Sequence, residues 1–251
     1  MNNDFFGRFY FIRYGTGLSK EKTDKEVSFL SEYLPLKKYK KLLDFNCGIG
    51  RHAIEMSLSG YEVDGIDFDP SSIAIARKLS SERDARTAHF FIKDAIRFTT
   101  AKKYDAAYCL YSSIGYDEDS LNELTYYNLL SSVRAGGRII IDLMNPEFAM
   151  NNIIKTSVKK KEFENERYII RHQREILENP TKERNIMEFT LERTGEYWKK
   201  EYTLRLYTED EIRNILSINN FYVFNIFGSF DKEAYSPQLE RMIFVADKKY
   251  E

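Results

Sequence analysis

The sequence predicts an α/β protein with a mostly parallel, seven-stranded sheet, helices on both faces of that sheet and a small antiparallel β insertion. Over residues 41–145, strand-like apolar runs alternate with helix-like segments, which indicates β-α units with right-handed crossovers. Residues 163–207 change to a period of two, as half-buried strands do. From Thr208 the chain returns to one helix and two more strands, so we expect the insertion to interrupt a single domain.

The segment 41–145 contains five expected strands. They are KLLDFN (41–46), YEVDGID (61–67), AHFFIK (88–93), YDAAYCL (104–110) and RIIIDLM (138–144). The last run is apolar without alternation, as in a strand that is buried on both faces. Ligands of such sheets bind beyond the carboxyl ends of the strands, and we expect the site at that edge.

Three helices are expected between these strands. The first runs from Arg51 to Ser59 and is stopped by Gly60. The second starts at Asp69-Pro70, because aspartate caps a helix and proline fits its first turn. The third is expected to end at Gly136-Gly137. Its inner stripe is expected to consist of Leu121, Leu124, Tyr127, Leu130 and Val133.

The insertion is expected over residues 146–207, as a lid on the ligand edge of the sheet. Within it, residues 163–207 predict a three-stranded antiparallel meander with one apolar face. That face is expected to carry Met187, Phe189, Leu191, Tyr202, Leu204 and Leu206. The preceding run Lys159-Lys160-Lys161 is flanked by acids and is interpreted as a solvated loop.

The remaining segments flank the core and the insertion. Residues 1–40 are expected to form a helical cap over the ligand. In residues 208–251, Thr208 and Glu211 predict a capping box that starts a helix. The strands 221–227 and 241–247 then complete the sheet as a β-hairpin.

Composition argues against several classes of partner. The net charge is −1 and the pI about 6.4, so neither nucleic acid nor an anionic membrane is an expected partner. No run reaches the roughly 18–20 apolar residues of a membrane span. Cys47 and Cys109 lack a paired spacing and predict reduced thiols in a cytoplasmic protein. The three histidines lack ligand spacing, so no metal is expected.

The turn after the first core strand matches a nucleotide-binding pattern. Gly48 to Ala53 fits G-x-G-x-x-A, and Asp67 lies 19 residues after Gly48, where dinucleotide-binding folds place an acid for a ribose hydroxyl. Asp44 argues against a dinucleotide, because two like charges ~4 Å apart repel by ~1–4 kcal/mol. The ammonium and sulfonium of S-adenosylmethionine would instead gain from Asp44. Asp94, at the next strand end, then suits the adenine amino group, unless it only caps a loop.

Several motifs resemble one enzyme family in order and spacing. They are LLDFNCGIGRHA (42–53), GYEVDGIDFDPSSIAIAR (60–77), KDA (93–95), YDAAYCLYSSIGY (104–116) and GGRIIIDLMN (136–145). Over roughly residues 10–145 the chain is similar to class I S-adenosylmethionine-dependent methyltransferases. The ending from Arg205 also resembles the small-molecule subgroup that methylates amino sugars at nitrogen. The resemblance implies a Rossmann-like fold and methyl transfer by in-line displacement.

The resemblance implies cofactor contacts for a set of residues at the strand ends. Asp44, Asn46, Cys47, Gly48 and Gly50 would surround the methionine part of the cofactor. Asp67 would bind the ribose, Phe68 would lie against adenine, and Asp94 with Ala95 would hold the adenine amino group. Leu110 and Tyr111 would lie near the sulfonium, and Tyr14 would close over the cofactor. Asn46 stands where the family usually has glycine. Asparagine tolerates the left-handed conformation, so the turn can form. Its amide is expected to bond either the cofactor or the loop.

The methyl acceptor is expected to be a nitrogen or oxygen of a small molecule. An amine needs little acid-base help, whereas a hydroxyl needs a base; the candidates for catalytic roles are Tyr14, His52 and Tyr111. For His52, the interpretation as a helix-start histidine packed by its neighbours is favoured over the role of a base. Candidates for acceptor contacts are Ser112, Tyr116, Asn145, Tyr207, Tyr235 and Arg241.

Two missing motifs bear on the substrate. The stretch after the fourth strand reads LYSS instead of the Asn/Asp-Pro-Pro-Tyr of enzymes that methylate exocyclic amines of DNA bases. There is also no Pro-Cys pair for attack on a pyrimidine ring. A methyltransferase acting on RNA or protein, and a non-catalytic cofactor-binding relative, remain as alternatives. A monomer and a homodimer are both compatible with the sequence.

Overall fold

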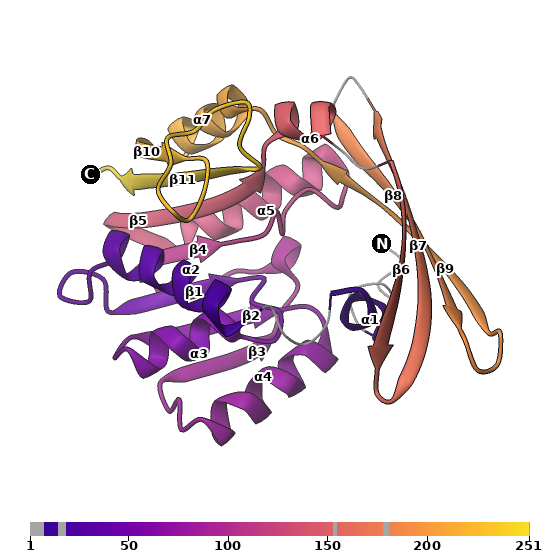
Figure 1. Ribbon diagram of the computed structural model, residues 1–251. Helices are drawn as coiled ribbons and strands as arrows, with labels where there is room; N and C mark the ends of the chain where they lie inside the picture. Colours follow the sequence, from indigo (N-terminus) through magenta and orange to yellow (C-terminus); the bar gives the residue numbers. More distant parts are fainter. Residues whose placement is uncertain (1–7, 15–18, 153–154, 178–180, 251) are drawn as a thin grey trace.

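The computed structural model describes residues 8–14, 19–152, 155–177 and 181–250, and it contains two sheets (Figure 1). The large sheet has the strand order β10-β11-β5-β4-β1-β2-β3, and the small sheet has the order β6-β7-β8-β9. We call these sheet A and sheet B. Sheet B stands beside sheet A with the short helix α1 (Tyr10–Tyr14) between them.

Sheet A confirms the predicted mostly parallel architecture. Its parallel strands are β1 (Lys41–Phe45), β2 (Glu62–Asp67), β3 (Ala88–Ile92), β4 (Tyr104–Cys109) and β5 (Val133–Met144). Two antiparallel strands, β10 (Phe221–Phe227) and β11 (Arg241–Lys248), extend it beyond β5. The predicted strands are all present, and β5 begins earlier than expected.

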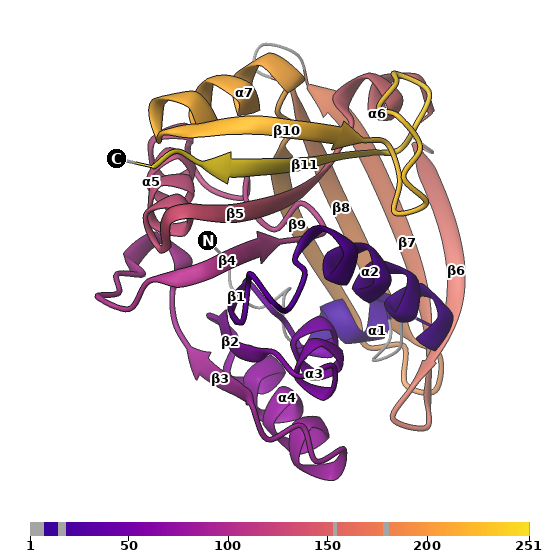
Figure 2. The ribbon, with the colours of Figure 1, turned by 90° about the vertical axis from the view of Figure 1, so that its left-hand side faces the viewer.

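Helices cover both faces of sheet A (Figures 1 and 2). On one face lie α2 (Lys20–Tyr33), α3 (Arg51–Leu58) and α4 (Pro70–Glu82), and on the other α5 (Asp119–Ser131) and α7 (Glu209–Ile218). Successive residues of a strand pack against helices on opposite faces of the sheet, because side chains alternate along a strand. Leu42 thus packs with α2 and α3, whereas Leu43 packs with α5 and α7. Short elements are η2 (Ala95–Arg97) and α6 (Pro146–Asn152).

The predicted start signals of two helices are confirmed. The Asp69 side chain accepts a hydrogen bond from the Ser72 amide at the start of α4, where Pro70 is the first helical residue. Thr208 and Glu211 form the expected capping box of α7. Both signals depend on a few neighbouring residues, which is why the sequence alone revealed them.

The predicted inner stripe of the third helix is confirmed at Leu130, which is buried, but is wrong at three other positions. In α5 the buried side chains include Tyr126 and Leu129, whereas Leu121, Leu124 and Tyr127 are exposed. The buried face also carries Asn122, Thr125 and Asn128. Because these residues are polar, the sequence pattern indicated a different face of the helix as the buried one. The helix ends at Ser131. Val133 and Gly136-Gly137 belong to β5, because the chain turns into the strand at once.

The three antiparallel strands expected over residues 163–207 are present, and a fourth strand that was not expected precedes them. The strands are β6 (Thr156–Phe163), β7 (Glu166–Leu177), β8 (Lys182–Leu191) and β9 (Tyr197–Arg205). Lys159, Lys160 and Lys161 form part of β6 and not a loop. They are exposed, and lysines on an edge strand discourage pairing with other chains, so the same composition suits an edge strand.

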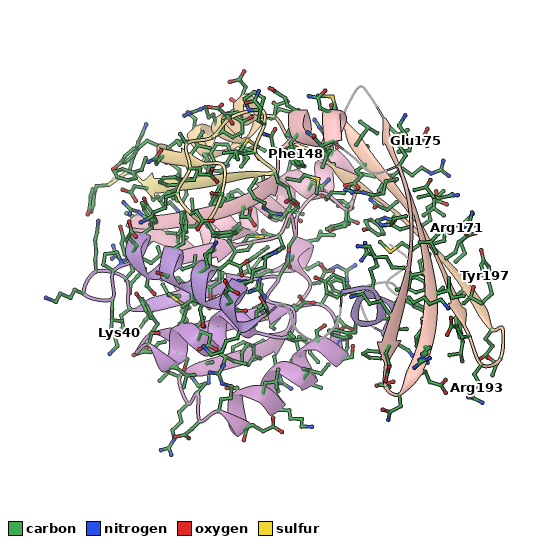
Figure 3. The ribbon with its side chains drawn as sticks, in the orientation of Figure 1. Lys40, Phe148, Arg171, Glu175, Arg193 and Tyr197 are labelled. Carbon is green, nitrogen blue, oxygen red and sulfur yellow. The ribbon has the colours of Figure 1, made fainter. Side chains whose placement is uncertain are left out.

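Sheet B has a polar outer face and a divided inner face. The outer side chains of Arg171 and Glu175 project away from the rest of the molecule (Figure 3). At one end the inner face is apolar and is covered by the N-terminal segment. This apolar cluster contains Phe9, Ile12, Tyr168, Ile170, Met187, Phe189 and Leu191. At the other end the inward positions are polar and face a cavity. We call His172, Arg174, Glu183 and Asn185 the polar end of sheet B.

The described helices include none that is long and apolar enough to cross a membrane.

The burial of α5 gives a direct test of its orientation. Leu129→Ala is expected to lower the free energy of unfolding by about 2–5 kcal/mol, because it leaves a cavity in a fully buried site. Leu124→Ala, on the exposed face, is expected to change it by less than about 0.5 kcal/mol. Urea unfolding of both variants measures the difference. Equal losses would contradict the orientation of α5.

Candidate functional site

A cavity of about 1270 Å³ lies between the carboxyl ends of the parallel strands and sheet B. It is lined by residues that follow β1, β2 and β4, by the N-terminal helices and by the polar end of sheet B. Nine carboxylate side chains line it against six lysines and arginines. This balance favours a ligand that carries positive charge. Among the described residues there is no cluster of His, Cys, Asp or Glu that fits a metal ion.

The turn after β1 shows why its residue types are needed. Asn46, Gly48 and Gly50 all have positive φ, at 61°, 54° and 73°, and asparagine and glycine tolerate this region best. A Cβ on Gly50 would lie 2.4 Å from the Phe90 ring, whereas nothing lies within 4 Å of a Cβ on Gly48. Gly50 therefore serves packing, and Gly48 leaves space on the cavity side.

The Asn46 amide bonds the protein itself. Its Nδ2 donates to the Ser113 carbonyl at 2.9 Å. This bond joins the turn after β1 to the loop after β4, so the two loops that line the cavity hold each other. Of the two partners expected for this amide, the loop is the one that the structure shows.

Asp44 is a buried carboxylate, and one of its two oxygens lacks a hydrogen-bond partner. It is 3% exposed, and no described group bonds its Oδ2. Burial raises the pKa of Asp44 to about 7, although the positive charge of Arg51 and hydrogen bonds from Tyr108 and the Ala53 backbone oppose the rise. A buried carboxylate without a full set of partners is costly, and a bound ammonium group would compensate it.

Asp67 is oriented by the backbone around it. Its Oδ2 accepts a hydrogen bond from the Gly48 amide at 2.9 Å, and its Oδ1 accepts one from the Asp69 amide at 3.0 Å. Each oxygen keeps a further lone pair for a hydroxyl. Burial raises the pKa of Asp67, and these amide bonds act against the rise. The carboxylate is therefore preorganised at the cavity wall.

The remaining predicted cofactor residues also lie at the cavity. Cys47, Phe68, Asp94, Ala95, Leu110 and Tyr111 all line it. Asp94 accepts a hydrogen bond from the Ile96 amide at 3.0 Å and so caps η2. It therefore fulfils the structural role that was the alternative to adenine binding, while it still borders the cavity. The side chain of Tyr14 lies outside the described residues, and its role stays a prediction.

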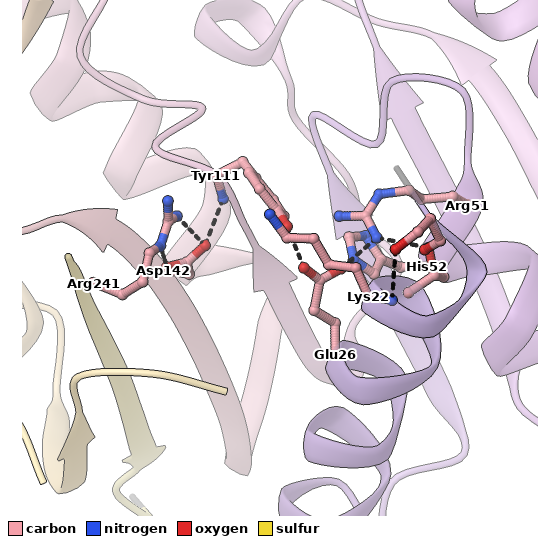
Figure 4. Close-up of polar contacts among 9 residues, drawn as sticks. Lys22, Glu26, Arg51, His52, Tyr111, Asp142 and Arg241 are labelled. Atoms are coloured by element: carbon pink, nitrogen blue, oxygen red, sulfur yellow. Dashed lines mark hydrogen bonds and ion pairs between the residues drawn. The ribbon is translucent and has the colours of Figure 1, made fainter. Parts of the chain in front are cut away.

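Glu26, which the sequence did not reveal, is the centre of a buried network (Figure 4). Its carboxylate accepts hydrogen bonds from Arg51, from His52 Nε2 and from the Tyr111 hydroxyl. Burial alone would raise the pKa of Glu26, but the bonds from His52 and Arg51 outweigh it and lower the pKa to about 2. Three elements, α2, α3 and the loop after β4, therefore meet at one negative charge.

The two predicted catalytic side chains at this end of the cavity have pKa values that do not favour a role as a base. The His52 ring is buried and its Nε2 is bonded to Glu26, and burial lowers its pKa. Burial and the bond to Glu26 raise the pKa of the Tyr111 hydroxyl far above its usual range. The bonds to Glu26 hold both side chains in place at the cavity wall.

The backbone of Tyr111 and Ser112 is held in an uncommon conformation. Both have positive φ, at 62° and 52°, which costs energy for residues other than glycine. Asp142 holds this turn, because its Oδ2 accepts a hydrogen bond from the Tyr111 amide at 2.8 Å and its carbonyl accepts one from Ser112. Arg241 from β11 pairs with the buried Asp142 carboxylate, and its guanidinium lies 5.0 Å from the centre of the Tyr111 ring.

The six predicted acceptor contacts divide into two groups. Ser112, Tyr116 and Arg241 line the cavity, whereas Asn145, Tyr207 and Tyr235 are not among its lining residues. The Asn145 amide donates to the Ser236 and Leu239 carbonyls and thus anchors the loop before β11. Tyr207 packs edge-on against Tyr126 in the core. Tyr235 lies against the same core.

The polar end of sheet B is the part of the site that the sequence reasoning missed. Arg174 pairs with Glu183, and His172 Nε2 lies 2.7 Å from Asn185 Oδ1. A signal was present, because these side chains continue the inward positions of Ile170 in β7 and Met187 in β8. Polar residues at buried positions of a strand mark a site more often than a core.

The cofactor-binding core predicted from the sequence is similar to a known family of protein domains. Residues 42–137 match a family described as a methyltransferase domain. The chain is 25% identical over 212 residues to a protein of Geobacillus sp. (strain WCH70). That protein is named as a methyltransferase. This match covers 83% of the present chain and 85% of that protein.

Solved structures share the whole fold. An S-adenosylmethionine-dependent methyltransferase from Clostridium acetobutylicum superposes with a TM-score of 0.78 at 13% identity, covering 96% of this chain and 97% of that one. The CcbJ methyltransferase from Streptomyces caelestis gives 0.79 at 11% identity, covering 96% and 95%. An amino pentose methyltransferase from Micromonospora echinaspora, solved with S-adenosylmethionine bound, gives 0.69 at 16% identity, covering 96% and 97%.

The Glu26 network predicts a pH-dependent contribution to stability. Because the folded pKa of about 2 lies below the ordinary value, the contribution is complete above pH ~4.5 and is lost as the pH falls towards ~2. Glu26→Gln is expected to cost about 3 kcal/mol at neutral pH. Chemical unfolding across this pH range measures the effect. The exposed Glu21→Gln on the same helix is the control, and a loss independent of pH would contradict the assignment.

Proposed function

We propose that the chain is a class I S-adenosylmethionine-dependent methyltransferase and that it methylates a nitrogen of a small-molecule acceptor, which enters between sheet A and sheet B. The observation that carries the proposal is the buried Asp44 with its unpartnered Oδ2 beside the open face of Gly48. A cationic amino acid group fits this position, whereas a pyrophosphate would meet a negative charge.

The described residues fit the parts of the cofactor one by one. Asp44 would bind the ammonium, Asp67 the ribose hydroxyls, and the surface of Phe68 and Asp94 the adenine. Arg51 stands on the same wall, and its Nη2 is buried without a hydrogen-bond partner, which suits the carboxylate of the methionine part. When bound, S-adenosylmethionine supplies a methyl carbon that its sulfonium activates. The chain's task is then to hold a nucleophile in line with that carbon.

Nitrogen is favoured over oxygen as the acceptor. A hydroxyl needs a base near pH 7, whereas a neutral amine attacks without one. The lowered pKa of His52 and the raised pKa of Tyr111 make both groups poorly suited to deprotonate a hydroxyl. Two structural neighbours, at 17% and 16% identity, are described as a sugar N-methyltransferase and an amino pentose methyltransferase, which supports the same choice.

A small acceptor is favoured over a nucleic acid. The cavity lining carries more carboxylates than basic groups, so a phosphate backbone would be repelled. Sheet B supplies one wall and the N-terminal helices another, which encloses a molecule of limited size. We propose sheet B as the lid on the acceptor side. The buried, unpaired thiols of Cys47 and Cys109 support a place in the reducing cytoplasm.

Cofactor binding and methyl transfer test the proposal together. The chain is expected to bind S-adenosylmethionine and S-adenosylhomocysteine in calorimetry and to transfer tritiated methyl groups to a panel of small amines. Asp67→Ala is expected to weaken cofactor binding on the order of tenfold to a hundredfold, because hydrogen bonds to a charged group are lost. The exposed Asp210→Ala is the control. Absence of cofactor binding by the folded wild-type chain would refute the function.

Asp44 predicts how cofactor affinity depends on pH. In the free protein its pKa is about 7, and a bound ammonium favours the ionised form, so binding releases a proton at lower pH. The affinity for S-adenosylmethionine is expected to rise up to about tenfold per unit between pH ~5.5 and ~7 and then to level off. Calorimetry in two buffers of different ionisation enthalpy measures the proton. Asp44→Asn is expected to bind weakly without this slope, and a flat wild-type profile would contradict the role.

A further inference from the structure

The polar end of sheet B is built around His172, which the cofactor assignment does not use. His172 is 5% exposed and belongs to β7, while its partner Asn185 belongs to β8. The two side chains share the inward face of the sheet with Arg174 and Glu183, and all four line the cavity.

The hydrogen bonds fix the state of the His172 ring. The Asn185 Nδ2 donates to the Glu183 carbonyl, which turns its Oδ1 towards His172 Nε2. An amide oxygen only accepts hydrogen bonds, so the proton must reside on Nε2. The neutral ring then carries a lone pair on Nδ1. Within the described part of the chain, the hydrogen bonds of His172 end at Asn185.

The surroundings keep the ring neutral. Burial lowers the pKa of His172 to about 4, and the positive charges of Arg13, Arg174 and Lys159 act in the same direction, against the bond to Asn185. At neutral pH the ring is therefore uncharged, and its Nδ1 can accept a hydrogen bond.

The neighbouring groups define what kind of molecule fits there. Arg174 is paired with the buried Glu183, so the polar end of sheet B presents little net charge to a ligand. The rings of Tyr116 and Tyr202, 5.8 Å apart, add apolar surface to the same cavity. This combination suits a polar, uncharged group that donates a hydrogen bond.

We propose that His172 Nδ1 accepts a hydrogen bond from a hydroxyl or N–H group of the methyl acceptor and so helps select which acceptors bind. The inference rests on the proposed function, because it places the acceptor at the wall opposite the glycine turn. His172 is a binding and positioning residue in this scheme and takes no proton during transfer.

The first arm of the test needs no acceptor. The chain has three histidines, so nitrogen NMR of the full chain labelled with ¹⁵N-histidine resolves each ring, with His89→Gln and His172→Gln as assignment variants. His89 is exposed and lies outside this cavity. At neutral pH, His172 is expected to show a protonated Nε2 and an unprotonated Nδ1. A doubly protonated ring or a proton on Nδ1 overturns the proposal.

The second arm separates binding from a structural role. A glutamine amide can reach the place of Nε2 and preserve the bond to Asn185, whereas an asparagine oxygen takes the place of Nδ1. The assay supplies tritiated S-adenosylmethionine and the low-molecular-weight metabolite fraction of bacterial cells at limiting concentration. His172→Gln is expected to lose about tenfold in methyl transfer, the cost of one or two hydrogen bonds. His172→Asn is expected to retain more activity, and His89→Gln all of it.

The outcomes distinguish this inference from the function itself. Both His172 variants are expected to keep wild-type affinity for S-adenosylhomocysteine in calorimetry. A larger loss in His172→Asn than in His172→Gln, or equal losses, overturns the inference, because the bond to Asn185 would then be what matters. Absence of transfer by the wild-type chain refutes the proposed function and the inference together.

Discussion

One buried negative charge, the carboxylate of Glu26, determines how the site is closed. A charge in this position is tolerated only when strong partners surround it, and Arg51, His52 and Tyr111 supply them. These partners come from α3 and from the loop after β4, so α2 is fixed against both by electrostatics as well as by packing. His52 Nε2 and the Tyr111 hydroxyl are engaged there, whereas Arg51 uses Nη1 and keeps Nη2 without a hydrogen-bond partner. This arrangement suits the proposed methyl transfer to a nucleophile that needs no base, in which the task of the chain is positioning.

The sequence correctly predicted the structural features that depend on residues close together in the chain. The strands of sheet A, the cap of α4 by Asp69 and the capping box of α7 each depend on a few consecutive positions. The carboxylates at the strand ends were also accessible, because topology alone brings the ends of parallel strands to one edge. Asp44 and Asp67 thus reached the cavity as expected, and the resemblance to a family added the identity of the cofactor.

What the sequence could not reveal depends on contacts between distant segments. Glu26 lies in a helix of low apolar content, and its partners follow 25 to 85 residues later. The face of α5 was predicted wrongly because its buried side includes Asn128, whose amide bonds the Ala95 and Ile96 carbonyls of η2. Asn145 and Tyr207 have the residue types of a site, yet they stabilise a loop and a core. Whether a polar side chain is buried depends on the hydrogen-bond partners that it finds in the fold, and the sequence does not show those partners.

The turn at Tyr111 and Ser112 has a consequence for the order in which the molecule folds. Its left-handed backbone is supported by Asp142, and Asp142 is in turn neutralised by Arg241, which lies 99 residues further along the chain. Contacts over such separations form late, because a long loop must first be closed. Binding of the proposed cofactor at this turn would therefore select molecules in which β11 has already paired with β5. By mass action such a ligand would add to the stability of the completed fold, so the supply of the proposed cofactor would also act on the folding yield of the protein.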